Sequence, residues 1–98
     1  MAQEGSSGNA SESKLTLYPN PNRGDQLFVS LSNVQAGVEA IGVEVFDAFG
    51  KRVASRRIAT ADGLVNTTLD LHAMANGLYM VSINAGSQSW NERLVIQR

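Results

Sequence analysis

Apolar side chains alternate with polar ones in several short runs of this chain, and this period of two most restricts the folds open to it. In one run, Leu27, Val29 and Leu31 are separated by Phe28 and Ser30. Successive side chains of a β-strand point to opposite faces, so such a run is typical of a strand with one buried face. The pattern recurs along the chain, and no long run follows the period of a helix.

Turn-forming residues separate the alternating runs, and this spacing predicts the architecture. We expect seven strands, at residues 15–18, 27–32, 41–46, 51–58, 65–71, 77–85 and 88–98. The segment HAMANG is long enough for one short helical turn near residues 72–76, which Asn76-Gly77 would end with a left-handed residue. The predicted fold is therefore all-β: a seven-stranded antiparallel β-sandwich, immunoglobulin-like in architecture but without the Cys-Trp-Cys pattern.

The sequence DAFGK predicts a hairpin between the third and fourth strands. Asp47 can accept hydrogen bonds from the backbone that follows it, and Gly50 can adopt the positive φ of a type I turn with a bulge. The returning strand, KRVASRRI, carries four cations on a thin apolar pattern. Charge of this kind prevents strands from pairing edge to edge, so we expect an edge strand with a solvated face.

The sequence YPNPNRGD predicts a stiff turn behind the first strand. Pro19 and Pro21 restrict φ to about −65° and bias the residue before each of them toward extended backbone. Asn22 and Gly24 can adopt the backbone conformations that a tight return into the second strand requires. The turn thus holds the first strand in place.

Composition limits the partners and the number of domains. Eight basic and nine acidic residues give a formal net charge of −1, so we expect no nucleic-acid partner. No apolar run reaches the length of about 18 residues that spans a bilayer, so we expect no membrane insertion. Residues 1–13 are small and polar, and we interpret them as a flexible linker or as sequence added for expression, without an export signal. Residues 14–98 then form one domain, an excised C-terminal part of a larger protein.

Residues that carry chemistry are sparse. His72 is the only histidine, its place after a strand fits a cap or surface role, and no motif surrounds it with a nucleophile and an acid. Asp47, Asp62 and Asp70 each lie at a strand end, where a carboxylate serves a turn. We therefore expect no enzyme activity, no cofactor and no metal, with a calcium site at these acids as the weaker alternative.

Trp90 lies between polar neighbours in the last predicted strand. Its ring is either packed on the core, which a lone aromatic favours, or exposed for stacking on a sugar. The second interpretation leads to an alternative function: an immunoglobulin-like accessory module that binds carbohydrate or protein through Trp90, Tyr79 and Tyr18. That function requires the rings to be exposed together on one face.

Four segments occur in order along the chain: LTLYPNPNRGD, VEVFDAFGKRV, LDLHAMANGLYMVSI and ERLVIQR. Together they resemble the C-terminal sorting domain of type IX secretion substrates, type A, over residues 15–98. The sequence YPNP with a glycine three places on is the most specific part, whereas the hairpin pattern occurs in many β-proteins. The occurrence of all four in this order carries the resemblance.

The resemblance implies recognition roles for the matching positions. The first three motifs contain Tyr18, Pro19, Asn20, Pro21, Asn22, Gly24, Asp47, Gly50, Gly77, Leu78 and Tyr79. The C-terminal signal strand contains Glu92, Arg93, Leu94, Val95, Ile96, Gln97 and Arg98. The family usually carries Lys at a position like Arg93 or Arg98, and arginine keeps the charge but changes the hydrogen-bond geometry.

The resemblance also implies what such a domain does. It would be a non-catalytic secretion signal, covalently fused behind a cargo domain that enters the periplasm and then leaves the cell or stays on its surface. Its partners would be the type IX translocon and shuttle components, together with a sortase-like cysteine peptidase. That peptidase would cut in the linker before Lys14 and join many cargos to an anionic lipopolysaccharide.

The exposed edges of a small sandwich predict how the signal is read. Recognition by strand addition uses backbone groups that many cargos share, so one receptor can serve them all. We expect the last strand, residues 88–98, to have no following chain to cover it and to act as a recognition element. The same edges allow an edge-strand dimer.

Overall fold

The structure of the protein is a computed structural model, which describes residues 13–98. The alternating runs form strands because β-branched and other apolar residues repeat every second position between Gly, Pro, Asn and Asp turns. The strands are β1 (Lys14–Tyr18), β2 (Gln26–Ser32), β3 (Ala40–Phe46), β4 (Arg52–Ala59), β5 (Val65–Asp70), β6 (Gly77–Ala85) and β7 (Gln88–Ile96).

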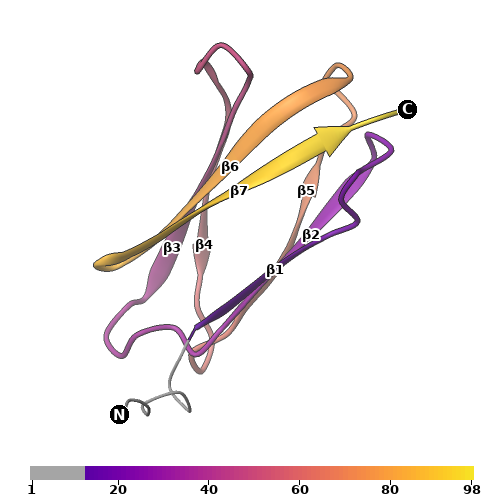
Figure 1. Cartoon of the computed structure of the whole chain (residues 1–98). Coiled ribbons are helices and arrows are strands. Elements are labelled where there is room, and N and C mark those ends of the chain that lie inside the picture. The colour runs from indigo at the N-terminus through magenta and orange to yellow at the C-terminus, as the bar shows by residue number, and fades with distance from the viewer. Residues whose placement is uncertain (1–12) are drawn as a thin grey trace, which may run out of the picture.

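The strands form two antiparallel sheets that face each other (Figure 1). One sheet has three strands in the order β1-β2-β5, and the other has four in the order β4-β3-β6-β7. The predicted all-β sandwich of seven strands is therefore confirmed. Between Ser13 and Arg98 there is no helix with the length and apolar character that crossing a membrane requires.

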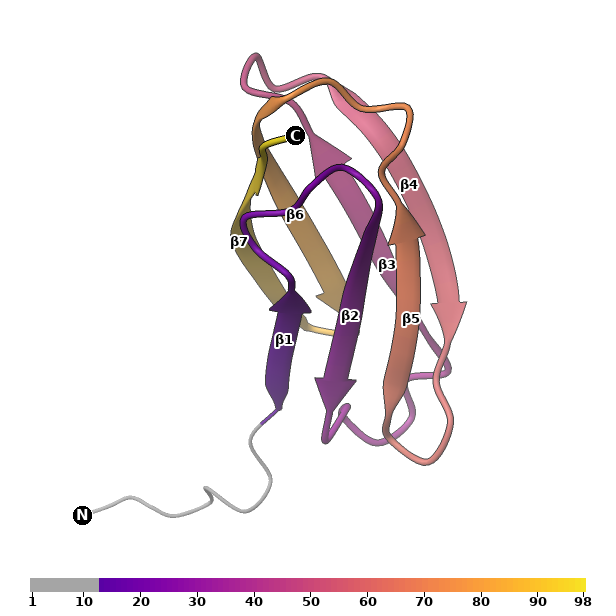
Figure 2. The ribbon, with the colours of Figure 1, turned by 90° about the vertical axis from the view of Figure 1, so that its right-hand side faces the viewer.

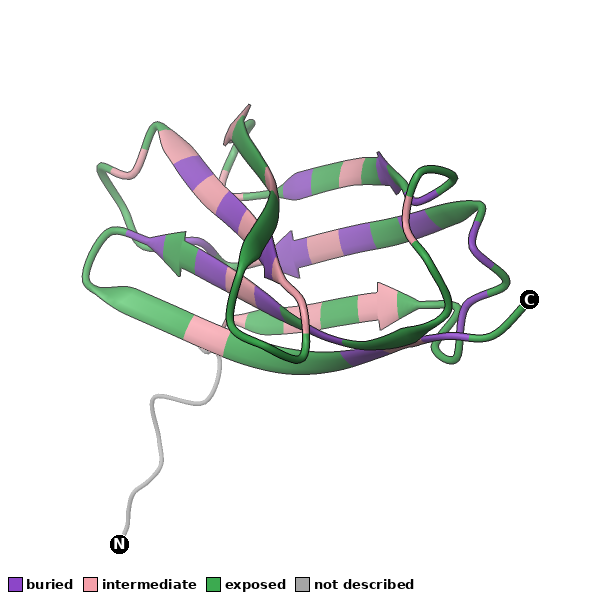
Figure 3. Ribbon diagram, turned by 90° about the horizontal axis from the view of Figure 1, so that it is seen from above, coloured by how far each residue is buried: buried purple, intermediate pink, exposed green. Residues whose placement is uncertain are grey.

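The core lies between the sheets and consists of the inward positions of the alternating runs. Leu27, Val29 and Leu31 of β2 are each at most 1% exposed. Figure 3 shows the alternation as bands of buried and exposed residues along the strands. The other strands contribute Ile41, Val43, Val45, Val65, Leu69, Val81, Ile83, Leu94 and Ile96. Burying one such side chain stabilises the fold by about 1.5–3 kcal/mol, so the predicted faces account for much of its stability.

The hairpin between β3 and β4 has the geometry that its sequence predicts. The Asp47 carboxylate accepts hydrogen bonds from the backbone N–H groups of Phe49 and Lys51, each at 2.9 Å. Gly50 has φ +84°, and the β3-β4 register shifts next to Phe46. β4 is an edge strand of the larger sheet, as the four cations of residues 51–58 predict.

The segment after β5 differs from the expected helical turn near residues 72–76. It forms a turn in which the Met74 N–H donates to the Leu71 carbonyl at 3.0 Å, and no helix follows. Gly77 has φ +154° and begins β6 directly, so it is not the left-handed residue that ends a helix. The segment is too short to repeat the turn, because Leu71 is buried and β6 starts at Gly77.

The predicted linker falls almost wholly outside the described residues. Of residues 1–13, only Ser13 is described, and its hydroxyl donates to the Asn33 carbonyl at 2.7 Å. β1 begins at the next residue, Lys14, which is opposite Ser32 of β2. The first described strand therefore begins at Lys14, and the boundary between residues 13 and 14 stays a prediction.

Candidate functional site

Four segments that are distant in the sequence meet at one end of the sandwich, the upper end in Figure 2. They are residues 19–25 between β1 and β2, the hairpin 47–50, residues 71–76 between β5 and β6, and residues 97–98 after β7. We call this the motif end, because all the motifs of the sequence contribute to it. The opposite end is formed by residues 33–39, 60–64 and 86–87.

Asn22 organises the turn at the motif end. Its side chain is 1% exposed and is the one buried polar side chain among residues 13–98. The side-chain amide donates to the carbonyls of Pro19 at 3.1 Å and Gln26 at 2.9 Å. Its oxygen accepts from the N–H groups of Gly24 at 2.8 Å and Asp25 at 3.2 Å. One side chain therefore closes the whole loop, in which the peptide bonds before Pro19 and Pro21 are cis.

The turn is also hydrogen-bonded to the outer edge of β7. The Asn22 N–H donates to the Val95 carbonyl, and the Gln97 N–H donates to the Asn22 carbonyl, both at 2.7 Å. The Asn20 side chain adds a donor to the Arg93 carbonyl at 2.6 Å and an acceptor for the Val95 N–H at 3.1 Å. The turn thus acts as a short parallel strand beside β7, centred on the bridge between Asn22 and Ile96.

This pairing corrects one expectation about the last strand. We expected no chain to cover it, yet the Asn20–Asn22 segment occupies its outer edge from Arg93 to Gln97. On the inner side Leu94 and Ile96 are at most 1% exposed. The final third of the strand is therefore a structural part of both the core and the turn.

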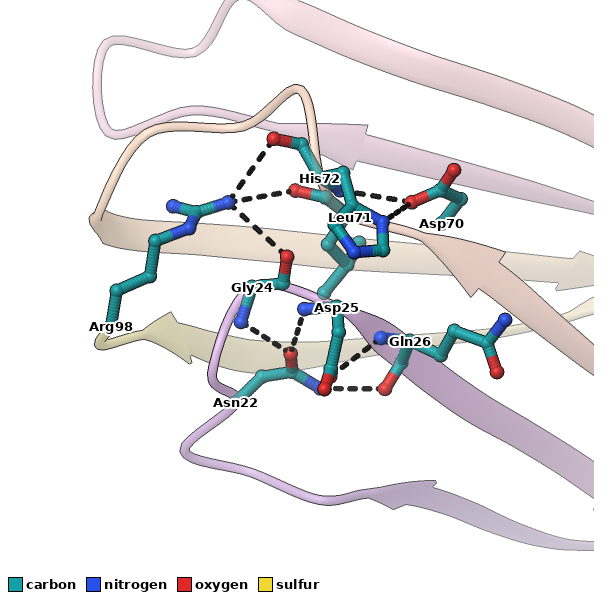
Figure 4. Close-up of polar contacts among 8 residues, drawn as sticks. All are labelled: Asn22, Gly24, Asp25, Gln26, Asp70, Leu71, His72 and Arg98. Atoms are coloured by element: carbon teal, nitrogen blue, oxygen red, sulfur yellow. Dashed lines mark hydrogen bonds and ion pairs between the residues drawn. The ribbon is translucent and has the colours of Figure 1, made fainter.

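Arg98 joins three segments of the motif end (Figure 4). Its Nη2 donates to the carbonyls of Gly24 and Leu71, both at 3.2 Å, and of His72 at 3.3 Å. Its Nη1 and backbone N–H both reach the Asn76 side-chain oxygen, at 3.3 and 3.1 Å. A planar guanidinium has several fixed donors, so it suits this set of carbonyls better than the ammonium of lysine does.

Gly24 is required by the position of Arg98. Its φ is +83°, a conformation that side chains rarely adopt. A Cβ at this position would collide with the guanidinium of Arg98. The glycine of the opening motif therefore leaves room for the last residue of the chain.

Asp70 and His72 border the same site. The Asp70 carboxylate accepts a hydrogen bond from the His72 backbone N–H at 3.0 Å and contacts the ring Nδ1 of His72. These hydrogen bonds hold the pKa of Asp70 below its ordinary value of 3.8, the backbone bond having the larger effect. His72 is exposed, as its predicted surface role requires. In the part of the chain from Ser13 onward, no group of three or more acidic or histidine side chains is placed to hold a metal ion.

The outer surface beside the motif end contains exposed apolar side chains. Phe49 at the hairpin tip is 95% exposed, Leu78 is 46% exposed and Met80 is 42% exposed. A shallow hollow of about 410 Å³ is lined by Asp47, Ala48, Leu78, Tyr79, Met80 and Arg93. Among the remaining motif residues, Gly50 and Gly77 carry no side chain, and Glu92 is exposed on β7. The hollow therefore adjoins three of the four motifs.

The aromatic residues of the alternative binding module do not share a face. Tyr79 is 8% exposed, and its hydroxyl donates to the Ala75 carbonyl at 2.7 Å. Trp90 is half-buried against the core, as the sequence predicts, and it is opposite Ile83 of β6. Tyr18 belongs to the other sheet. The proposed grouping of these rings is therefore wrong.

The fold and the motif end together define a small β-sandwich domain whose polar motif residues are engaged in joining distant segments. Residues 16–97 match the family model described as a secretion system C-terminal sorting domain. The chain belongs to this family, the C-terminal sorting domains of type IX secretion. The chain is a sorting signal of that system. Membership of the family implies export across the outer membrane, either to the cell surface or into the medium. No curated protein matches the chain.

Proposed function

We propose that this domain is a non-catalytic signal that carries a covalently fused upstream cargo through the periplasm to the type IX translocon. The family match over residues 16–97 supports this function most directly. The position of the motifs agrees with it, because they build one end of the sandwich rather than a cleft with reactive groups.

The translocon and its shuttle components read the motif end in this proposal. The polar motif residues are engaged inside the domain, so the groups open to a partner are the exposed ones around them, such as Phe49, Leu78 and Arg93. Exposed apolar side chains beside a charged one are typical of the anchors by which proteins recognise each other. The turn and β7 then act by presenting this surface in a fixed shape.

Attaching residues 13–98 to a fluorescent protein that is exported to the periplasm of a type IX secreting host tests the function. We expect fluorescence at the cell surface or in the medium, and none there in a host without the translocon. Retention of the intact fusion in the periplasm of the normal host would contradict the sorting role.

A matched pair of variants tests whether the translocon recognises the exposed surface around Leu78. Leu78 and Leu64 are both 46% exposed, but Leu78 is beside the motif end and Leu64 is at the opposite end. We expect Leu78→Ser to retain the fusion in the periplasm and Leu64→Ser to leave delivery unchanged, with similar melting temperatures for both isolated domains. Equal delivery of the two fusions would show that the translocon recognises a different surface.

We also propose that a sortase-like cysteine peptidase cuts before Lys14. A cut there leaves β1 whole, whereas a cut within Lys14–Tyr18 would remove backbone partners of β2. Mass spectrometry of the released fragment should therefore give an N-terminus at or before Lys14. Anchoring of the cargo to lipopolysaccharide should appear as a mobility shift of the cargo, lost together with cleavage in a host without the peptidase.

A further inference from the structure

The outer face of the three-stranded sheet carries a pair of aromatic rings that do not line the motif-end hollow. Tyr18 of β1 is directly opposite Phe28 of β2. Their rings stack with centroids 5.2 Å apart and an interplanar angle of 21°. Tyr18 is 51% exposed and Phe28 is 40% exposed, so the pair is a surface feature and not part of the core. Packing of the two rings on each other leaves apolar ring surface open to solvent.

Polar side chains without intramolecular partners flank this pair. In the register of the sheet, Phe28 is opposite Thr68 of β5, and Ser30 is opposite Asn66. Ser30, Asn66 and Thr68 make no side-chain hydrogen bond to any residue of the described chain. They can therefore donate and accept hydrogen bonds toward a molecule on this face.

The rings and the polar groups border one shallow depression of about 380 Å³. It is lined by Tyr18, Phe28, Val29, Ser30, Asn66, Thr67 and Thr68. No charged side chain belongs to this lining. An anion or a cation would thus find no counter-charge there, and the chemistry of the site favours a neutral ligand with both apolar and hydroxyl surfaces.

We propose that this face binds a neutral oligosaccharide. The C–H face of a pyranose ring with equatorial hydroxyl groups packs on the open surface of Phe28 and Tyr18. Its hydroxyl groups exchange hydrogen bonds with Ser30, Asn66 and Thr68 across the depression. The inference does not depend on the sorting role, because the depression lies on β1, β2 and β5 and the motif-end hollow lies on the other sheet.

Titration of the labelled domain, residues 13–98, with cellohexaose and with xylohexaose tests the proposal by NMR. At least one of the two should cause saturable shifts in the amides of residues 28–30 and 66–68, with a Kd on the order of 1 mM for so open a site. A charged hexamer of galacturonic acid should bind at least about tenfold more weakly, because the lining holds no cation and the guanidinium of Arg56 is already hydrogen-bonded to the Thr68 carbonyl. Absence of shifts with both neutral sugars, or shifts centred on β6 and β7, would overturn the proposal.

Two phenylalanines give a matched control. Phe28→Leu removes the ring from the depression, and Phe49→Leu makes the same change at the exposed tip of the β3-β4 hairpin, away from the depression. We expect Phe28→Leu to raise the Kd about tenfold, since it removes a stacking contact, and Phe49→Leu to leave it unchanged. Asn66→Ala tests the polar side of the site and should also weaken binding while the melting temperature stays the same. Equal affinity of all three variants would refute the assignment.

Discussion

Asn22 is a buried polar residue with every hydrogen-bonding group used. Its side-chain amide bonds two carbonyls and two N–H groups, and its backbone N–H and carbonyl both pair with β7. A buried polar group without partners costs more than a hydrogen bond gains, so complete pairing is what makes an asparagine stable here. The side chain replaces a regular turn, because Pro19 and Pro21 lack backbone N–H groups.

Asn22→Ala should destabilise the domain strongly. The change leaves two carbonyls and two N–H groups of the turn without their partner, which we expect to lower the free energy of unfolding by about 2–4 kcal/mol. Urea denaturation followed by tryptophan fluorescence measures the difference. Asn84→Ala, at an exposed position of β6, serves as the control and should change it by less than about 0.5 kcal/mol.

Gly24 and Arg98 should be energetically coupled. Gly24→Ala places a Cβ where the guanidinium lies, so the arginine must leave its three carbonyl acceptors. In a double-mutant cycle with Arg98→Ala we expect Gly24→Ala to cost about 1 kcal/mol less than it does in the normal chain, because the collision is already gone. Strictly additive effects would contradict the contact. Arg98→Lys should recover only part of the stability lost in Arg98→Ala.

Asp70 should make the domain less stable in acid. Because the pKa of Asp70 is lowered in the folded state, its contribution is present above its ordinary pKa of 3.8 and disappears as the pH falls through the folded value. Asp70→Asn should therefore have a lower melting temperature than the normal chain at neutral pH, and the gap should close in acid. A gap that stays constant down to low pH would show that the carboxylate charge plays no part.

At the scale of elements, the turn and β7 form one structure. Deletion of residues 93–98 would remove Leu94 and Ile96 from the core as well as the acceptors of the turn. We expect such a chain to lose cooperative unfolding, so its failure in secretion would report lost folding and not lost recognition. Point changes in the turn separate the two effects better.

Asn20→Ala should loosen the pairing without unfolding the domain. It removes the acceptor of the Val95 N–H but leaves the backbone bonds of Asn22 in place. We expect hydrogen exchange of the Val95 amide to become roughly tenfold faster or more, while the Val81 amide in the centre of the sheet keeps its rate. Unchanged exchange at Val95 would mean that the side-chain bond adds no protection.

Much of the fold could be predicted from local pattern. Alternation every second residue gave the strands and their buried faces, and the hairpin followed from Asp47 and Gly50 because its bonds span four residues or fewer. The prediction of a helical turn near residues 72–76 was wrong, because buried Leu71 and the start of β6 leave room for only a single turn between them.

The assembly of the motif end could not be predicted in this way. The contacts from Asn20 to β7 join residues 73 and 75 positions apart, and those of Arg98 span up to 74 positions. No periodicity or turn rule relates residues at such distances. The sequence pointed to the motif residues one by one through family resemblance, and the structure adds that the first and last motifs pair directly.

At the scale of the whole molecule, the edges of both sheets are partly protected. The turn covers the end of β7, and Arg56 of β4 donates to the Thr68 carbonyl of β5 at 3.2 Å. β4 is rich in cations, and β1 has only five residues. Covered, charged and short edges all disfavour pairing between copies of a chain.

We therefore expect a monomer in solution. The edge-strand dimer that the sequence left open is disfavoured by these covered, charged and short edges. Sedimentation velocity of the isolated chain should give a mass near 10.5 kDa across a wide range of concentrations. Asn20→Ala, which uncovers part of the β7 edge, is the variant most prone to associate. A normal chain that dimerises at micromolar concentration would show that an edge remains free to pair.

The pairing of the turn with β7 also determines when a newly made domain can become complete. Asn20, Asn22 and Gly24 leave the ribosome early, but the β7 partners of the two asparagines and the Arg98 partner of Gly24 are synthesised about 70 residues later. Until then the turn has no edge on which to dock, and the larger sheet lacks a strand. A motif end of this design is finished only after residues 93–98 have been translated, so its assembled shape distinguishes a domain that includes them from one that stops before them.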